Sequence, residues 1–324
     1  MNGKSLLKKL QEISPEEQAY LDGRGNVKKE MYTLKQLFEI DKQLFLKEGR
    51  LVTMRPHTRF VNFPEHSHNY IEIMYVCKGN ITNYIEGKEI IMQKGDVLLL
   101  NQHVRHSVRK ADYDDVGINF IALPEFFEIP LSMLGRNNAL ANFLVSTLCQ
   151  KRKIADYLLF KVGDDLAIEN LMENMIVSVI NEEKDSDSLN QHLMGLVFLY
   201  LMKHIEKLTT NYSQNPHDVM VQSLINYIYT SYQTASLTEF AEDFHQSVSA
   251  LSKLMKQSTG MTFQEMLQKT RFKKATQLLM GTDMPIDEIA IAVGYENQSY
   301  FYRRFKEIYG MTPRKYKILN LHGK

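Results

Sequence analysis

Cysteine, tryptophan and long apolar runs are scarce or missing in this sequence. Its 324 residues include two cysteines, Cys77 and Cys149, and no tryptophan. Two cysteines provide neither a disulfide framework nor a paired-thiol metal motif, which fits a reducing compartment. No apolar run reaches the roughly eighteen residues of a membrane helix, and the N-terminus lacks the apolar core of a secretory signal. We therefore expect a soluble, cytoplasmic protein that does not bind membranes.

An excess of charge of either sign is also missing, because the formal net charge is only +1 at pH 7. Bulk charge therefore does not indicate a nucleic-acid partner. The basic residues are unevenly placed, however, and many gather in the last third of the chain, where a basic strip suits phosphate groups. Any one of them could equally belong to an ordinary solvated face. These residues are Lys253, Lys256, Lys269, Lys273, Lys274, Arg303, Arg304, Lys306, Arg314, Lys315 and Lys317.

The last third of the chain, roughly Val219 to Leu319, contains one pattern twice. In the first copy an apolar residue precedes Ala241 by four positions, and a Gly-Met-Thr follows at Gly260. The second copy repeats this spacing around Ala290 and Gly310. A period of about fifty residues that occurs only twice is too short an array for a solenoid. It indicates a duplicated helical module.

Each copy is typical of two helices joined by a tight turn. Ser247 is a good N-cap for the second helix of the first copy, and Gly260 ends that helix. In the second copy Gly294 permits the turn. Thr262 begins a connecting helix that runs through Met280, about 28 Å long at 1.5 Å per residue. Such a helix could hold two recognition helices about one DNA turn apart, roughly 34 Å.

The second copy carries a family resemblance. Its run IAIAVGYENQSYFYRRFKEIYGMTPRKY, from Ile289 to Tyr316, resembles the signature of AraC/XylS-type bacterial transcription regulators. The alternative is a plain helical bundle without a DNA role. The resemblance implies an all-α domain with two helix-turn-helix modules over 217–324. It also implies a homodimer on double-stranded DNA with two half-sites, and RNA polymerase is a further expected partner.

The candidate DNA-binding residues lie on the outward faces of the two recognition helices. Matching the family motif position by position assigns base or phosphate contacts to most of them, and Arg303 could pair with guanine as Gln298 could with adenine. The first module has small serines at two contact positions, so we expect less base discrimination from it. The full set is Ser249, Ser252, Lys253, Lys256, Asn297, Gln298, Ser299 and Arg303.

The residues before the repeat divide into three parts. Residues 1–50 are polar with a helical pattern, and Ser14-Pro15 is a helix start. Residues 51–135 alternate with a period of two, which predicts a small antiparallel barrel or jelly roll. Residues 136–211 return to a helical pattern with wide apolar faces, which either cover the barrel or mediate dimerisation; the predicted helices are 139–159, 166–181 and 189–208. The best linker candidate is Tyr212–Pro216.

A polar constellation lies within the predicted barrel. In the segment from His66 to Gly79, alternation places His66, His68, Tyr70 and Glu72 on one face of a strand. With His106, this spacing resembles the two cupin motifs, although Asn101 stands where metal-binding cupins usually have a proline. Three interpretations stay open: a metal set of three histidines and a carboxylate, a metal-free polar pocket, and a hydrogen-bonded structural network. The candidate ligand-binding residues are Arg59, His66, His68, Tyr70, Glu72 and His106, with Tyr84 and Asn119 as weaker ones.

These observations predict an α+β multidomain protein: a cupin-like barrel with flanking helices, followed by an all-α pair of helix-turn-helix modules. We expect a non-enzymatic transcription regulator that responds to a small-molecule effector, such as a sugar or another polar metabolite, bound in the cupin-like domain. We assign no metal ligand and no cofactor. The alternative is a cupin metalloenzyme fused to DNA-binding modules. A nucleophile elbow and a phosphate-binding glycine loop are both missing from the sequence.

Overall fold

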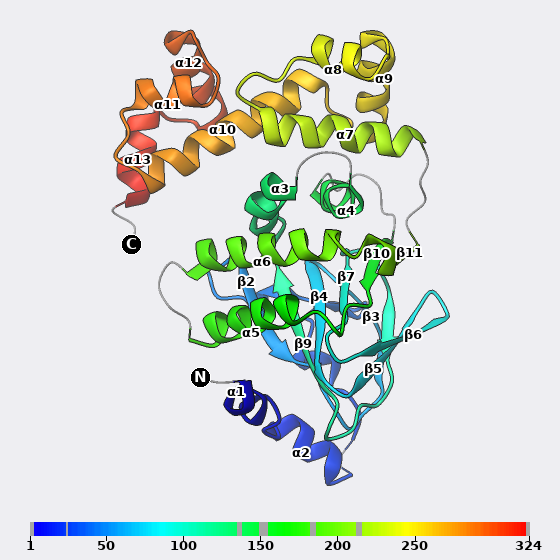
Figure 1. Cartoon of the computed structure of the whole chain (residues 1–324). Helices are drawn as coiled ribbons and strands as arrows, with labels where there is room; N and C mark the ends of the chain where they lie inside the picture. The colour runs from blue at the N-terminus through cyan, green and yellow to red at the C-terminus, as the bar shows by residue number, and fades with distance from the viewer. Residues whose placement is uncertain are drawn as a thin grey trace. The chain divides into compact units, whose positions relative to one another are not determined.

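The computed structural model describes residues 3–23, 25–134, 138–148, 155–181, 186–211 and 216–321. The chain divides into two compact units, Met1–Gln214 and Asn215–Lys324. The first unit is rich in strands and the second is all-α, which confirms the predicted fold class (Figure 1). Among the described residues, no helix has both the length and the apolar character needed to cross a membrane. The proposed linker Tyr212–Pro216 lies almost wholly outside the described residues, and so does Cys149.

Two β-sheets form the centre of the first unit. The five-stranded sheet has the order β1 (Glu39–Ile40), β3 (Phe63–His68), β8 (His106–Val108), β5 (Asn80–Ile85) and β6 (Lys88–Gln93). The six-stranded sheet has the order β11 (Leu208–Thr210), β10 (Tyr157–Phe160), β7 (Val97–Leu100), β4 (Ile71–Lys78), β9 (Val116–Ala122) and β2 (Val52–Pro56). Apolar side chains from both sheets share one buried core, which includes Met74, Ile81, Ile85, Leu98 and Leu100.

Helices cover the other face of the six-stranded sheet. They are α3 (Glu128–Leu134), α4 (Ala139–Leu148), α5 (Leu166–Asn181) and α6 (Ser186–Met202), and Figure 1 shows α5 and α6 lying across its strands. Strand β4 is therefore buried on both faces, with Ile71, Ile73 and Tyr75 almost inaccessible on the helical side. Gly195 lets α6 approach α3 closely, because a Cβ there would collide with the Met133 sulfur.

Two predictions from periodicity are wrong in detail. The helix expected over 139–159 ends at Leu148, and Tyr157–Phe160 forms strand β10 between β7 and β11. A short apolar run that is buried on both sides fits a strand as well as a helix, so its periodicity does not distinguish the two structures. The sequence also predicts a helical pattern over residues 1–50, but Leu34 and Leu37 are 81% and 72% exposed in a segment without α-helix. The α-helices described within residues 1–50 are α1 (Gly3–Leu10) and α2 (Pro15–Leu21).

A buried ion pair attaches α2 to the sheets. Ser14 and Glu17 form a capping box at the start of α2, as the sequence indicated. The same Glu17 carboxylate accepts hydrogen bonds from Arg59 Nε at 2.8 Å and from the Arg59 backbone at 3.1 Å. Both side chains are buried, at 6% and 3% exposure. Burial alone would raise the pKa of Glu17, but the hydrogen bonds from Arg59 and Ser14 outweigh it and lower that pKa.

The second unit confirms the duplicated helical module. Helix α7 (Pro216–Ser231) precedes α8 (Leu237–Asp243) and α9 (Val248–Thr259); α10 (Phe263–Gly281) connects them to α11 (Ile286–Ala292), α12 (Gln298–Tyr309) and α13 (Pro313–Leu321). Gly260 and Gly310 end α9 and α12 at φ of 69° and 71°, a conformation that favours glycine. Gly294, at φ +91°, forms the second turn, where a Cβ would collide with the Gln233 carbonyl.

Arg59→Met should leave the Glu17 carboxylate buried without its cation. Removing one member of a buried pair costs about 3–5 kcal/mol. We expect urea unfolding, followed by circular dichroism, to show a loss of this size. Because the pKa of Glu17 is lowered in the folded state, the pair stabilises the fold above the unfolded pKa of about 4.3. The difference between the two proteins should shrink as the pH falls through the folded pKa.

Lys78→Met is the matched control. It removes an ion pair with Asp114 of similar length, 2.7 Å, but both side chains are exposed, at 40% and 72%. Exposed pairs contribute little to stability, so this variant should unfold close to the wild type. Equal destabilisation by the two substitutions would contradict a dominant role for the Glu17–Arg59 pair.

Candidate functional site

Four buried titratable side chains meet where the chain passes from one sheet to the other. His66 and His68 lie on β3, and His106, the partner of His66 in the ladder, begins β8. The chain then bends at Asn69 and Tyr70, and Glu72 belongs to β4 of the other sheet. The prediction that one strand carries His66, His68, Tyr70 and Glu72 is therefore wrong. The two sheets nevertheless bring the four side chains together, each no more than 3% exposed.

The side chains of this histidine cluster (His66, His68, His106 and Glu72) have closely spaced donor atoms. His106 Nε2 lies 3.4 Å from His68 Nε2 and 3.4 Å from Glu72 Oε2, and His68 Nε2 lies 3.5 Å from that same oxygen. A nitrogen from each of the three histidines can be chosen so that all lie within 4.8 Å of one another. These are oxygen and nitrogen atoms with lone pairs, of the kinds that bind cations and polar ligands.

The outer ring nitrogens of two histidines are held by oxygen acceptors. His66 Nδ1 donates to the Pro64 carbonyl at 2.8 Å, and His106 Nδ1 lies 3.0 Å from Asn83 Oδ1. The Asn83 amide nitrogen points toward the sulfur atoms of Met74 and Met92, which orients its oxygen toward His106. Because each Nδ1 is then the protonated nitrogen, each Nε2 keeps a lone pair directed into the cluster.

Burial controls the protonation of the cluster. It lowers the pKa of His66 and of His106 to about 3, and it lowers the pKa of His68 well below the usual range. The same burial raises the pKa of Glu72 to about 7. Among the described residues, Glu72 Oε2 and His68 Nδ1 have no hydrogen-bond partner. Buried polar atoms are rarely left in this state unless an ion, water or ligand binds them.

Two cavities adjoin the cluster. The inner one has a volume of about 20 Å³ and is lined by His66, Glu72 and His106, with Asn119 and Arg55 beside them. This is the space of a single water molecule or ion. The outer cavity has about 620 Å³, within the range of small-molecule sites. Of the predicted ligand residues, Tyr70 borders both cavities, His68 borders the outer one, and His66, Glu72 and His106 border the inner one.

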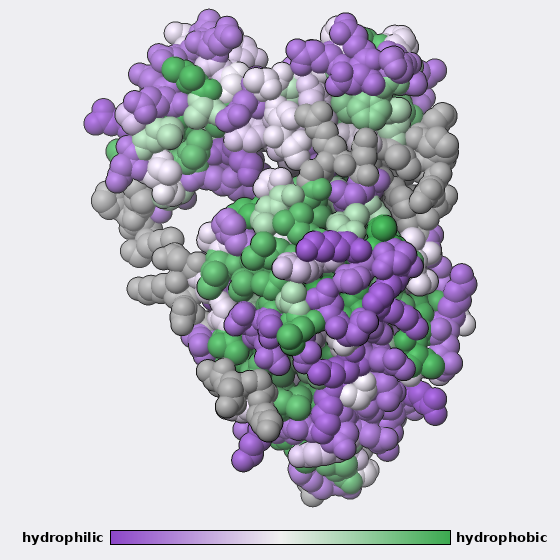
Figure 2. Space-filling view, in the orientation of Figure 1, coloured by the Kyte–Doolittle hydropathy of each residue, from purple (hydrophilic) through white to green (hydrophobic). Residues whose placement is uncertain are grey.

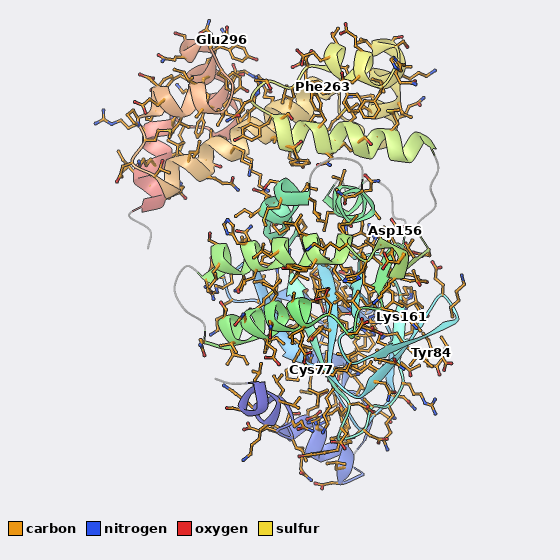
Figure 3. The ribbon with its side chains drawn as sticks, in the orientation of Figure 1. Cys77, Tyr84, Asp156, Lys161, Phe263 and Glu296 are labelled. Atoms are coloured by element: carbon orange, nitrogen blue, oxygen red, sulfur yellow. The ribbon has the colours of Figure 1, made fainter. Side chains whose placement is uncertain are left out.

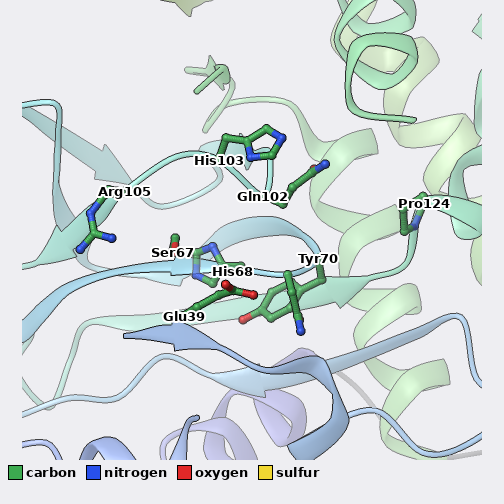
Figure 4. Close-up of a pocket in the computed structure, with 9 residues that line it drawn as sticks. Glu39, Ser67, His68, Tyr70, Gln102, His103, Arg105 and Pro124 are labelled. Atoms are coloured by element: carbon green, nitrogen blue, oxygen red, sulfur yellow. The ribbon is translucent and has the colours of Figure 1, made fainter. Parts of the chain in front are cut away.

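The outer cavity is bordered mainly by polar side chains from several segments (Figure 4). Glu39 comes from β1, which pairs in parallel with β3, and Arg105 belongs to the loop before β8. Glu39 is not among the residues predicted from the sequence, because a pairing between distant short strands leaves no local signal. The loop residues could have been found from their closeness to His106. The outer cavity is lined by Glu39, Ser67, His68, Asn69, Tyr70, Gln102, His103, Arg105 and Pro124.

Two candidate residues from the sequence lie elsewhere. The Arg59 guanidinium is occupied by Glu17 and by the carbonyl oxygens of Gln11, Glu12 and Tyr113, so it serves the attachment of α2 and borders neither cavity. Tyr84 donates to Glu89 within the β5–β6 hairpin (Figure 3). Asn119, by contrast, does border the inner cavity.

The predicted DNA-contact residues lie on α9, on α12 and at its N-cap. Gln298 and Ser252 are partly exposed and the other six are exposed, and Figure 2 shows mainly hydrophilic residues over α9 and α12. Asn297 also caps α12 by accepting a hydrogen bond from the Tyr300 backbone at 2.9 Å. Lys256 Nζ lies 3.3 Å from Glu265, and the Arg303 guanidinium lies 5.5 Å from the centre of the Tyr300 ring.

Comparison with known families matches both units. Residues 51–124 match an AraC-like ligand binding domain, and residues 240–317 match a helix-turn-helix domain. The transcriptional activator RhaR of Mannheimia succiniciproducens is 23% identical over 278 residues, which cover 84% of this chain and 94% of that protein. RhaR of Escherichia coli O6:H1 is 24% identical over 259 residues, 80% of this chain and 88% of that protein.

Solved structures are similar over parts or most of the chain. The C-terminal domain of AraT, a response regulator from Geobacillus stearothermophilus, is 36% identical and covers 31% of this chain and 84% of its own, with a TM-score of 0.30. ToxT from Vibrio cholerae is 15% identical and covers 82% of this chain and 96% of its own, with a TM-score of 0.35. The two matched domains, in the predicted order, identify the chain as a member of the AraC-type transcription regulators, with an AraC-like ligand-binding domain and a helix-turn-helix DNA-binding domain.

Proposed function

We propose that a small, neutral, polyhydroxylated metabolite such as a sugar binds in the outer cavity and controls how the second unit acts on DNA. The observation that carries this proposal is the cavity of about 620 Å³ within the AraC-like ligand-binding domain. Its lining offers imidazole, amide, carboxylate, guanidinium and phenol groups. Hydroxyl groups both donate and accept hydrogen bonds, so a polyol can use donors and acceptors of this kind together.

The charges at the cavity favour a neutral ligand. Glu39 pairs with Lys35 at 2.8 Å, and Arg105 pairs with Glu65 at 2.9 Å. The two charged residues of the lining, Glu39 and Arg105, therefore each pair with an opposite charge that lies outside the lining, and the cavity has no excess of charge of one sign. A charged ligand would have to compete with these pairs, whereas hydroxyl groups can bind beside them.

The proposed regulator binds operator DNA as a homodimer in the cytoplasm and acts with RNA polymerase. Its relatives are named transcriptional activators, which supports activation and favours regulation over the alternative of a metalloenzyme fused to DNA-binding modules. On α6, Leu189, Leu196 and Leu199 are 51%, 39% and 37% exposed. An exposed apolar row on one helix supports a two-fold interface.

The first prediction from the proposed function concerns effector binding. Glu39→Gln together with Gln102→Ala should abolish the thermal stabilisation that a bound sugar or polyol gives the wild type, which is about 2.7 kcal/mol at 100 times its Kd. A panel of neutral monosaccharides and polyols in a thermal-shift assay measures this. DNA affinity without ligand should stay close to wild type. Tyr84→Phe is the control, because Tyr84 borders neither cavity, and it should keep the full response. Stabilisation that survives the double substitution would remove the effector from this cavity.

The second prediction concerns base recognition by α12. Arg303→Ala should weaken binding to the cognate operator by about 1–3 kcal/mol and relax preference at one base pair. Arg303→Lys keeps the charge but loses the two-pronged geometry that reads guanine. The Arg303→Lys protein should therefore bind a scrambled duplex as tightly as the wild type does, and it should still lose the preference for one base pair of the operator. Fluorescence anisotropy on cognate and scrambled duplexes separates these effects. Unchanged operator affinity in Arg303→Ala would remove this residue from the recognition surface.

The third prediction concerns assembly. Leu196→Glu places a charge in the exposed apolar row of α6 and should convert dimers to monomers in sedimentation velocity at micromolar concentration. Leu34→Glu introduces the same charge at another exposed leucine, outside α6, and should leave the dimer intact. A wild-type protein that sediments as a monomer both with and without operator DNA would defeat the proposed dimer.

A further inference from the structure

We propose that Arg271 is a positioning residue that fixes the separation of the two recognition helices, α9 and α12, and thereby determines the spacing of the DNA segments that they bind. The spacing is the number of base pairs between the segment bound by α9 and the segment bound by α12. This role rests on DNA binding by the matched helix-turn-helix domain. Both helices belong to one compact unit, so the role depends neither on an effector nor on dimerisation.

Arg271 lies on α10 and reaches the turn that follows α7. Its Nε donates a hydrogen bond to the Tyr232 carbonyl at 2.7 Å, and its Nη2 donates to the Gln233 carbonyl at 2.9 Å. A planar guanidinium can hold two acceptors in a fixed geometry, whereas the ammonium group of a lysine cannot. Arg271 therefore fixes α10 to the turn after α7.

The same turn is also fixed to the second module. Gln233 Nε2 donates to the carbonyl of Ala292, the last residue of α11, at 2.9 Å. Gly294 follows in the chain, and a Cβ there would collide with the Gln233 carbonyl and with the Arg271 guanidinium. The turn between α11 and α12 is therefore packed directly against the turn after α7. We call these contacts of Arg271, Tyr232, Gln233, Ala292 and Gly294 the module joint.

Aromatic side chains connect the module joint to α12. The Arg271 guanidinium lies 5.3 Å from the centre of the Tyr295 ring, close enough for a cation to be attracted to the ring. The centre of the Tyr295 ring lies 5.2 Å from that of Phe272 on α10 and 5.6 Å from that of Phe301 on α12. Phe301 is fully buried. A change at the joint should therefore move α12 relative to α10.

Helix α7 also supports the first module. It packs against α9 and against α10, and Figure 1 shows it running alongside the first module. The two modules are therefore connected in two ways, by α10 and by α7 with the module joint. A single connecting helix would let the modules bend and twist relative to each other, whereas two connections form a closed frame. This frame holds α9 and α12 at one separation.

A fixed separation makes spacing a part of DNA specificity. One additional base pair moves the second DNA segment by about 3.4 Å along the helix axis and rotates it by about 35°. Two helices held in a rigid frame cannot follow this change, and a recognition contact that is misplaced by about 1 Å is already weakened. Without the module joint, bending and twisting at α10 would let α12 reach the displaced segment.

The test compares three duplexes that differ only in spacing. Full-length wild-type protein selects a preferred site from a randomised duplex library, and footprinting locates two bound segments about one DNA turn apart; one base pair is then inserted or deleted between them. Fluorescence anisotropy measures affinity. We expect the wild type to bind both altered duplexes roughly 10–100-fold more weakly, as for the loss of one or two base contacts. Arg271→Lys and Gln233→Ala should bind the preferred duplex more weakly and lose most of this discrimination.

Lys269→Ala is the matched control, because it removes an exposed cation of the same helix that takes no part in the module joint. It should change the affinity for all three duplexes by one common factor and so leave their ratios as in the wild type. Arg271→Lys keeps the charge, so its affinity should fall with salt as steeply as that of the wild type; a shallower slope would indicate a lost phosphate contact and contradict a positioning role.

The ratios of affinity separate positioning from a general loss of stability. Circular dichroism shows which variants fold, and Gln233→Ala still tests the module joint if Arg271→Lys does not fold. Folded variants that discriminate between the spacings as strongly as the wild type would overturn the proposal. Wild-type protein that binds the three duplexes equally, or protects one segment alone, would also overturn it.

Discussion

The bend between β3 and β4 is the constraint on which the first unit depends. At this point the chain leaves one sheet and enters the other, and Asn69 occupies the corner. Its amide donates to Asp41 at 2.9 Å and accepts from the Lys42 backbone at 2.9 Å. The backbone of Ser67 and Asn69 also donates to carbonyl oxygens of Phe38 and Ile40. A single corner therefore positions the histidine cluster and, through β1, one wall of the outer cavity.

The volumes of the two cavities distinguish two kinds of occupant, a polar metabolite and a metal ion, that the residue types alone could not distinguish. Histidines and a carboxylate fit either a polar metabolite or a metal ion, and composition alone cannot choose between them. The inner cavity of about 20 Å³ is too small for a metabolite, and the outer cavity of about 620 Å³ is far too large for an ion alone. The two cavities therefore differ in the size of occupant that they can hold, and Tyr70 borders both.

Local patterns predicted the parts of the fold that local forces determine. Caps at Ser247 and Thr262 and left-handed glycines at Gly260 and Gly310 act within one helical turn, so both modules could be predicted from sequence. Strand β10 and the pairing of β1 with β3 depend on distant segments, and no local period encodes them. The spacing of His66, His68, Glu72 and His106 indicated a cluster, but not its division between two sheets. Arg59 looked like a pocket residue because its partner, Glu17, lies forty-two positions earlier in the chain.

The two helix-turn-helix modules share a plan but differ in how their recognition helices are held. In the second module, Arg304 donates to Gln268 of α10 at 2.6 Å, and Phe301 and Phe305 pack with Phe272 of the same helix. In the first module the exposed Lys256–Glu265 pair links α9 to α10, and an exposed pair is a weak restraint. A recognition helix discriminates bases only as far as its position is fixed, because a shift of an ångström breaks a paired hydrogen bond. Both recognition helices are anchored by buried side chains, so the expectation that the second module reads bases more closely depends on the longer polar side chains of α12 compared with the serines of α9.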